Sequence, residues 1–428
     1  MKRLVAWILA LVMLFALTAC TQSGKTEETQ APAQTTDTQP AQSGEQTDAP
    51  EAADGETYKI GIGCAMTGTS ATYGAMMKCG AEMAIEEINE AGGVNGRMLE
   101  LIALDDKQDA SEAALVAQRF ADMDYLQFVI AHGGSALTLA AGPIYEAAKL
   151  PFFSCCSSSP SLTQQGWEYY VRFGTRDDGV APSCVAFLKN NLGYSKIGIL
   201  YENTDSGVGN YESCKLTAEQ LGVEIVCAET YNAGLEKDFS TIINKFQVSG
   251  AEAMCIYMAH DDAGLYLNQA HALGFDLPTA GCSGIAYATT VEIAGADAMQ
   301  NVYMLLAFNP YSQREFCKQL NAHFDTAWNT EDLPSEPCGI SYQIIYAWKQ
   351  AIEEGATKAN VAQWIKNTTP DKDYTFVIDP AHALQGDNVH FEEDGDQVLG
   401  GISIIKVDES GSFYDYNMEV DSTGVVRQ

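Results

Sequence analysis

The sequence predicts an α/β protein of two Rossmann-like lobes, each built on a parallel sheet. Three observations indicate this fold. Apolar strands alternate with amphipathic helices from Tyr58 onward, the alternation restarts after Val171–Gly174, and the chain has 428 residues. A single core rarely grows beyond about 250–300 residues, so this length favours two lobes. Strands that alternate regularly with helices favour parallel sheets covered on both faces.

Residues 1–19 are predicted to be a secretory signal. Lys2 and Arg3 precede an apolar run that ends at Leu17, and small residues lead to Cys20. This pattern is typical of a signal whose cleavage leaves a lipid-modified cysteine, and a cleaved signal followed by an unmodified cysteine is the alternative. The apolar run is too short for a stable membrane span.

Residues 20–56 are rich in Thr, Gln, Ala, Pro, Ser and acids and nearly lack large apolar side chains. Such a segment buries too little surface to fold, which predicts a disordered tether. We therefore expect a protein outside the cytoplasm that is anchored to the cell membrane by lipid on Cys20.

The chain is strongly acidic. It has 57 acidic and 24 basic residues, for a formal net charge of −33, and loss of Lys2 and Arg3 with the signal makes it more negative. Such a surface repels nucleic acid and anionic headgroups, so we expect no nucleic-acid partner. Lipid, and not charge, would hold the protein at a membrane.

The cysteines are expected to be buried thiols. The chain has 12, and most of those after Cys20 lie in apolar strand or helix contexts. No disulfide can be assigned from their spacing. There is no C-x-x-C pair, and the six histidines do not fall at zinc-ligand spacings, so we expect no metal and no cofactor.

Residues 57–175 and 308–372 are predicted to form the first lobe. Strands are predicted at Tyr58–Ala65, Leu99–Leu104, Leu126–Ala131 and Pro151–Ser154. Helices are predicted at Met77–Ile88, Ser111–Met123, Ala136–Lys149, Glu315–Trp328, Tyr342–Glu353 and Val361–Asn367. The first of these helices has apolar residues at helical spacing with glutamates opposite, and Gly92-Gly93 ends it.

Residues 176–307 and 373–428 are predicted to form the second lobe. Strands are predicted at Lys196–Tyr201, Glu224–Thr230, Ala253–Met258 and Val302–Ala307. Helices are predicted at Ala181–Asn191, Gly209–Leu221, Phe239–Val248 and Ala263–Leu273. The tail, from Asn388–Phe391 to Gly401–Val407, predicts a β-hairpin on this lobe.

Two strand ends in the first lobe carry hydroxyl-rich corners. Ser157, Ser158 and Ser159 follow one strand, and Pro160 suits the first turn of a helix. Ser135 follows His132-Gly133-Gly134 at the end of another strand. Free backbone N–H groups at such corners favour a carboxylate or phosphate, although an ordinary capped helix is the alternative interpretation.

No enzyme motif is complete. Met66 stands where a dinucleotide fingerprint that begins at Gly61 needs its third glycine, and Gly281–Gly284 lacks the spacing of a nucleophile elbow. Cys155-Cys156 has no histidine nearby in sequence. We expect no catalytic activity, and an exported cysteine hydrolase is the enzyme alternative.

Several short segments together resemble the leucine/isoleucine/valine-binding proteins of ABC importers, and the resemblance extends from Tyr58 to the tail. The segments are Ile62–Gly68, Tyr73-Gly74, Ile88–Gly93, Asp105-Asp106, Ile144–Glu146 and Lys237–Phe239. The resemblance implies a type I periplasmic binding protein, in which two Rossmann-like lobes are joined by a hinge of three crossovers and close on an amino acid.

The same resemblance assigns candidate binding residues. In the first lobe the ligand carboxylate would lie at Ser135, Cys156 and Ser158, and Tyr73 would wall the side-chain pocket. In the second lobe the matching loops contain Asp205-Ser206 and His260-Asp261.

The sequence departs from the family pattern at three places. The acid that binds the α-ammonium group falls on Ser283, and a tyrosine of the second lobe falls on Ser206. Asp205, Asp261 or Asp262 could supply the missing charge. Lys107-Gln108 and Gly134 occupy the places of the family's cysteine bridge.

The sequence therefore predicts a monomeric, lipid-anchored solute-binding protein. Its ligand would be a small carboxylate-bearing solute, namely an amino acid such as a branched-chain one, bound by hinge closure. Its partner would be an ABC permease in the membrane. An extracellular sensor of the same fold, for an amino acid, amide or small organic acid, is the alternative.

Overall fold

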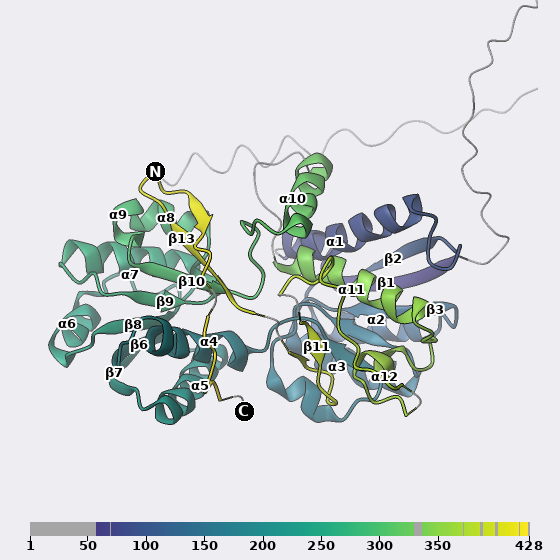
Figure 1. The fold of residues 1–428 in the computed structure, drawn as a ribbon, viewed down its shortest axis with the longest axis horizontal. Helices are drawn as coiled ribbons and strands as arrows, with labels where there is room; N and C mark the ends of the chain where they lie inside the picture. The colour runs from purple at the N-terminus through teal and green to yellow at the C-terminus, as the bar shows by residue number, and fades with distance from the viewer. Residues whose placement is uncertain are drawn as a thin grey trace, which may run out of the picture. The chain divides into compact units, whose positions relative to one another are not determined.

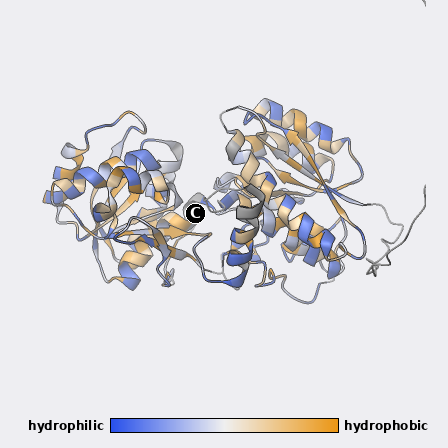
Figure 2. Cartoon of the chain, turned by 90° about the horizontal axis from the view of Figure 1, so that it is seen from above, coloured by the Kyte–Doolittle hydropathy of each residue, from blue (hydrophilic) through white to orange (hydrophobic). Residues whose placement is uncertain are grey.

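The computed structural model describes residues 57–68, 70–328, 336–370, 372–385, 388–398, 401–418 and 420–426. The predicted signal, Cys20 and tether lie outside this range. The described chain forms two large sheets with helices on both faces (Figure 1). Apolar residues gather on the strands and on the inner faces of the helices (Figure 2). This is the two-sheet α/β architecture that the alternating pattern predicts.

The first sheet has five parallel strands in the order β2-β1-β3-β4-β5. These are β1 (Tyr58–Cys64), β2 (Leu99–Asp105), β3 (Leu126–Ala131), β4 (Phe152–Ser154) and β5 (Tyr170–Arg172). The sequence pattern missed β5, a three-residue strand in which only Tyr170 and Val171 precede the charged Arg172. Since β1 and β3 are neighbours, the order reverses between them, and the loops that follow these strands diverge at this edge.

Two pairs of helices cover the first sheet. On one face α2 (Ala110–Ala121) packs against α3 (Ser135–Ala147), and on the other α1 (Ala71–Glu90) packs against α11 (Glu336–Glu353). Gly80 permits the close approach of α1 and α11, because a Cβ atom there would lie 1.8 Å from the carbonyl oxygen of Cys338. The remaining helices of this part are η1 (Pro160–Gln165), α10 (Glu315–Trp328) and α12 (Val361–Ile365).

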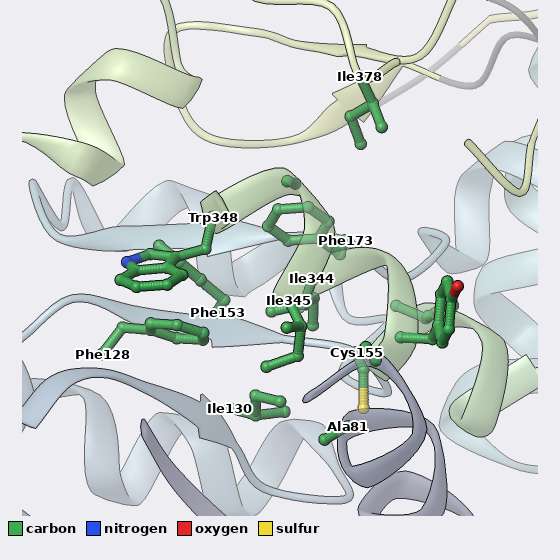
Figure 3. Packing of buried hydrophobic residues seen from close by; sticks show 14 of the residues in the cluster. Ala81, Phe128, Ile130, Phe153, Cys155, Phe173, Ile344, Ile345, Trp348 and Ile378 are labelled. Atoms are coloured by element: carbon green, nitrogen blue, oxygen red, sulfur yellow. The ribbon is translucent and has the colours of Figure 1, made fainter. Parts of the chain in front are cut away.

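Aromatic and aliphatic side chains fill the space between α11 and the first sheet (Figure 3). The ring of Phe128 on β3 lies 4.9 Å from that of Phe153 and 5.5 Å from that of Trp348 on α11. Fully buried aromatic groups of this size contribute much of the hydrophobic stabilisation of a core. This packing fixes α11 on the sheet.

The second sheet has seven strands in the order β14-β13-β10-β9-β8-β6-β7. Five of them are parallel: β6 (Lys196–Glu202), β7 (Glu224–Tyr231), β8 (Ala253–Tyr257), β9 (Thr279–Gly281) and β10 (Val302–Leu306). β13 (Ser403–Val407) and β14 (Phe413–Asp415) add antiparallel at one edge. The predicted strand in the tail thus joins the second sheet, as expected.

The helices of the second sheet belong to two separate apolar clusters, one on each face. One face carries α4 (Asp177–Ala186), η2 (Phe187–Asn191) and α5 (Asp205–Leu221). The other carries α6 (Ser240–Ser249), α7 (His260–Ala272), η3 (Ser283–Ile285), α8 (Ala288–Ala294) and α9 (Ala296–Met299). Because β6 and β8 are neighbours, the strand order reverses between them, so this sheet also has a switch point.

One prediction about the tail is wrong. The hairpin of β11 (His390–Phe391) and β12 (Gln397–Val398) packs on the first lobe and not on the second. The ring of Phe391 lies 4.7 Å from that of Phe173, and the N–H of Arg172 donates to the carbonyl of Gly395 over 2.8 Å. Burial of Phe391 and of the preceding apolar segment in the first core explains this placement.

The chain changes sheet three times: after β5, after β10, and between β12 and β13. None of the described helices combines the length and the apolar composition that a membrane crossing requires.

Candidate functional site

The end of β3 forms a tightly held turn. The buried His132 has a φ of 26°, which is uncommon for a residue other than glycine. Its Nδ1 lies 2.8 Å from Oδ2 of Asp106 and its Nε2 lies 3.1 Å from the hydroxyl of Tyr145. The side-chain amide of Gln108 donates to the carbonyl of Gly133 over 3.1 Å. These contacts fix the turn that leads into α3 at Ser135.

The end of β4 forms the second corner. The hydroxyls of Ser157 and Thr138 lie 2.8 Å apart and are buried. Ser159, and not Ser158, caps η1, because its side chain accepts from the N–H of Ser161. The predicted helix is a short 3-10 helix. Ser158 is half-exposed, and no described residue hydrogen-bonds its side chain.

The two corners touch. The N–H of Ser159 donates to Oγ of Ser135 over 3.1 Å. Since a hydroxyl both accepts and donates, the Ser135 proton remains available to another acceptor. The structure thus brings Ser135 and Ser158 to one edge of the first sheet.

The buried Arg172 holds the second corner in place through hydrogen bonds to its backbone. Arg172 on β5 donates to the carbonyls of Ser157 and Ser159 over 3.1 and 2.8 Å. Its Nε donates to Oδ1 of Asp396 over 2.6 Å, and Arg176 pairs with the other oxygen of this carboxylate. Charges buried so deeply require such pairing. The hairpin that carries Asp396 therefore holds the serine loop in place.

Tyr73 and Cys156 also lie at this edge. Gly74 lets the first turn of α1 approach β1, because a Cβ atom there would lie 1.9 Å from the carbonyl oxygen of Ala65. The Tyr73 ring packs against Gly133, and Cys156 lies near enough to add to the raised pKa of the Tyr73 hydroxyl, whose main cause is desolvation. Tyr73 itself keeps 41 % of its surface exposed. The predicted residues of the first lobe are therefore neighbours.

The thiols at this edge lack the features of a nucleophile. The sulfurs of Cys155 and Cys156 lie 2.9 Å apart. Burial, followed by the contact with Cys155, raises the pKa of Cys156 well above its ordinary value. A protonated thiol attacks poorly. None of the eleven cysteines among the described residues forms a disulfide, and most are buried, as expected.

Glu336, at the first turn of α11, was missed by the sequence analysis. The hydroxyl of Thr175 donates to its Oε1 over 3.2 Å, and desolvation raises the pKa of this half-buried carboxyl. Local desolvation of the titrating group is the main cause of the raised pKa of Tyr73, Cys156 and Tyr287, and the charge of Glu336 adds to it in all three. The helix was predicted to begin only at Tyr342, although an acid before an apolar run is a helix-start signal.

The second lobe presents exposed polar residues where β6, β8 and β9 end. They are Ser206 at the start of α5, His260 and Asp261 at the start of α7, and Ser283 in η3. The ring of His260 lies 5.0 Å from that of Tyr287. Asp205 is the first residue of α5. These positions share the carboxyl edge of the second sheet, where ligands bind in this class of fold.

Asp262 has a different role. It is buried, its Oδ2 accepts from the N–H of Gly234 over 2.7 Å, and its Oδ1 lies 3.7 Å from Nζ of Lys237. Asp262 therefore stabilises the loop after β7, which contains Gly234 and Lys237. Among the described residues, no group of His, Cys, Asp and Glu has an arrangement that could hold a metal ion.

Comparison with known proteins agrees with this geometry. The family model described as "Periplasmic binding protein" matches residues 57–411. The leucine-, isoleucine-, valine-, threonine- and alanine-binding protein of Pseudomonas aeruginosa is 30 % identical over 341 residues, which cover 80 % of this chain and 87 % of that protein.

Two solved structures share the fold. The branched-chain amino acid transporter substrate-binding protein of Streptococcus pneumoniae, in complex with isoleucine, has a TM-score of 0.66 and 23 % identity over 85 % of this chain and 99 % of that one. An ABC transporter substrate-binding protein of Desulfitobacterium hafniense, in complex with leucine, has a TM-score of 0.67 and 24 % identity over 84 % of this chain and 100 % of that one.

The family match includes the whole first sheet and all of the second except β14, and the relatives are substrate-binding proteins and not enzymes. The chain therefore belongs to the periplasmic binding protein family, as an extracytoplasmic binding protein without catalytic activity.

Proposed function

We propose that this protein is a lipid-anchored solute-binding protein of an ABC importer, and that it delivers an amino acid, such as a branched-chain one, to a membrane permease. The names of its relatives support the ligand class, since one is named for leucine, isoleucine, valine, threonine and alanine, and two similar structures hold isoleucine or leucine. No cofactor is required for this role.

The observation that carries the proposal is the contact between the two serine corners. Because Oγ of Ser135 accepts from the N–H of Ser159, its own proton is free for a ligand. Ser135 begins the 13-residue helix α3, whose N-cap Gly134 offers no side-chain cap. The first N–H groups of α3 therefore keep their capacity to bind an anion. With the hydroxyl of Ser158 nearby, this edge suits a carboxylate.

The three changes of sheet support a hinge. We propose that the lobes close around the solute, so that Ser206, His260, Asp261 and Ser283 reach it from the second lobe, with Asp205 as a further candidate. Small-angle scattering tests this step. A saturating ligand should reduce the radius of gyration, whereas equal radii with and without ligand would show a rigid body.

The anchor at Cys20 is proposed from sequence alone. Changing Cys20→Ser should leave the protein unlipidated and release it from membranes in high salt. Retention of this variant at wild-type level would refute the lipoprotein proposal. The protein is proposed to act as a monomer, which sedimentation of the unlipidated variant tests directly.

The decisive experiment is a ligand panel. Thermal unfolding is measured with leucine, isoleucine, valine, threonine, alanine and small organic acids, and each hit is followed by calorimetry. A ligand at about 100 times its Kd adds about 2.7 kcal/mol to the free energy of unfolding. If no amino acid raises the unfolding temperature, the ligand class is wrong. A sensor of the same fold would bind the same solutes, but its loss would leave their uptake unchanged.

A further inference from the structure

Helices α1 and α11 pack as a pair, and Tyr73 and Glu336 lie in their first turns, at the same end of the pair. The two helices run parallel, since Cys338 of α11 meets Gly80 of α1, and Tyr346 further along α11 donates to Glu87 over 3.0 Å. The first turn of α11 therefore lies beside the part of α1 that precedes Gly80. Tyr73, two residues into α1, projects from that part.

The carboxylate of Glu336 has no cationic partner within the described part of the chain. The contact found for it there is the hydroxyl of Thr175, at 3.2 Å. The nearest arginine in sequence to that threonine, Arg176, pairs with Asp396. A half-buried carboxylate without a counter-charge is costly, which is a common property of residues that bind ligands.

Two tyrosines, Tyr73 and Tyr287, lie within electrostatic range of this acid. The negative charge of Glu336 adds to the raised pKa of Tyr73, Tyr287 and Cys156. A carboxylate beside tyrosine rings is suited to an ammonium group, which gains a charged hydrogen bond and favourable contacts with the ring faces. An anion at this place would instead be repelled.

Two of the acids suggested from the sequence fit this task less well. The carboxylate of Asp262 already accepts a hydrogen bond from the N–H of Gly234 and pairs with Lys237. Asp261 keeps 66 % of its side chain exposed and lies 3.5 Å from the ring of His260. Water would screen a charge in such an exposed place.

We propose that Glu336 binds the ammonium group of the solute, in place of the acid that the family pattern puts at Ser283. This inference rests on the proposed function and makes it more specific. Thr175 bonds Glu336, and the adjacent Gly174 packs against the backbone of Cys155 and Cys156, which lead to Ser158. The carboxylate and the ammonium group of one small amino acid would therefore be bound at neighbouring positions. The solute is thus a zwitterion and not a simple organic acid.

The test compares each amino acid with its deaminated analogue. Affinities for leucine, isoleucine, valine, threonine and alanine, and for the corresponding acids without the amino group, are measured by calorimetry on the full chain. The variants are Glu336→Gln and, as a matched control, Glu353→Gln. Glu353 lies at the other end of the same helix, where its carboxylate pairs with Lys349 at 2.6 Å.

The wild type should bind an amino acid and bind its deaminated analogue poorly. Glu336→Gln should weaken amino-acid binding by about ten- to a hundredfold, as expected for a lost charged hydrogen bond, and should leave the weak binding of the analogue unchanged. Glu353→Gln should match the wild type. Equal amino-acid affinity in Glu336→Gln and wild type overturns this inference alone. A wild type that binds none of the amino acids overturns the proposed function and this inference with it.

Discussion

The N–H of Ser159 donates to the hydroxyl of Ser135 over 3.1 Å, so the ends of β3 and β4 are joined by a direct hydrogen bond. The contact lies beside Ser158, which has no partner among the described side chains, and beside the uncapped start of α3. The Ser135 hydroxyl therefore joins the two strand ends and is also proposed to bind the ligand. Ser158 is proposed only to bind the ligand. This difference makes the two serines separable by mutation.

Ser158→Ala should weaken amino-acid binding by about ten- to a hundredfold and leave the stability of the free protein unchanged. The cap of η1 is Ser159, so no capping energy is lost with Ser158. Calorimetry gives the affinity and thermal unfolding gives the stability. Ser249→Ala, at the end of α6, is a control that removes a hydroxyl from another place in the fold. Wild-type affinity in Ser158→Ala would place the carboxylate elsewhere.

Ser135→Ala should weaken binding by a similar factor and also lower the free energy of unfolding. The N–H of Ser159 loses its acceptor in this variant, and an unsatisfied donor that is partly buried costs about 1–3 kcal/mol. Chemical denaturation without ligand measures this cost. A variant as stable as Ser158→Ala would contradict the structural task assigned to the Ser135 hydroxyl.

Asp396→Asn should destabilise the protein by about 3–5 kcal/mol, because it leaves the buried Arg172 without its counter-charge. Ligand binding should also weaken, since Arg172 holds the carbonyls of Ser157 and Ser159. Glu393→Gln changes an exposed charge in the same hairpin and serves as the control. If Asp396→Asn unfolds at the wild-type denaturant concentration, the proposed support of the serine loop by the hairpin is wrong.

These residues show what the sequence could and could not predict. The strand Leu126–Ala131 was predicted with its observed bounds, because apolar residues followed by a glycine turn are a local signal. The hairpin was assigned to the wrong lobe because its contacts are distant in sequence: the bond between Arg172 and Asp396, for example, joins residues 224 positions apart. No local pattern reports such a contact.

The start of α11 was missed for a similar reason. Pro337 and Gly339 have low helix propensity, so the helix was predicted to begin at Tyr342. In the structure, tertiary packing stabilises this turn, since Cys338 lies directly against Gly80. Glu336 was consequently left out of the predicted site, although the corners formed by Ser135 and Ser158 were found from capping chemistry alone.

The last prediction concerns the pH dependence that follows from Glu336. Desolvation raises the pKa of this carboxyl above its ordinary value of 4.5 in the folded state. The folded protein therefore retains the proton to a higher pH than the unfolded chain does. Above pH 4.5 the unfolded chain is the first to ionise, so the contribution of Glu336 to stability falls as pH rises through the interval between the two pKa values.

Ligand binding should have the opposite dependence. The ammonium group needs the ionised carboxylate, so affinity should rise over the same pH interval in which the stability of the free protein falls. Glu336→Gln should remove both effects: at neutral pH the free variant should be at least as stable as wild type, and its weak amino-acid binding should no longer respond to pH in this range.

The measurement is thermal unfolding of wild type, Glu336→Gln and Glu353→Gln from pH 4 to pH 8, with and without the amino acid that binds best. Without ligand, the unfolding temperatures of wild type and Glu336→Gln should converge below pH 4.5, where the carboxyl of Glu336 is protonated in both the folded and the unfolded state. Glu353→Gln should follow wild type throughout. A Glu336→Gln variant that is less stable than wild type at neutral pH would show that this carboxylate supports the fold, and its loss of binding could then no longer be attributed to the ammonium group.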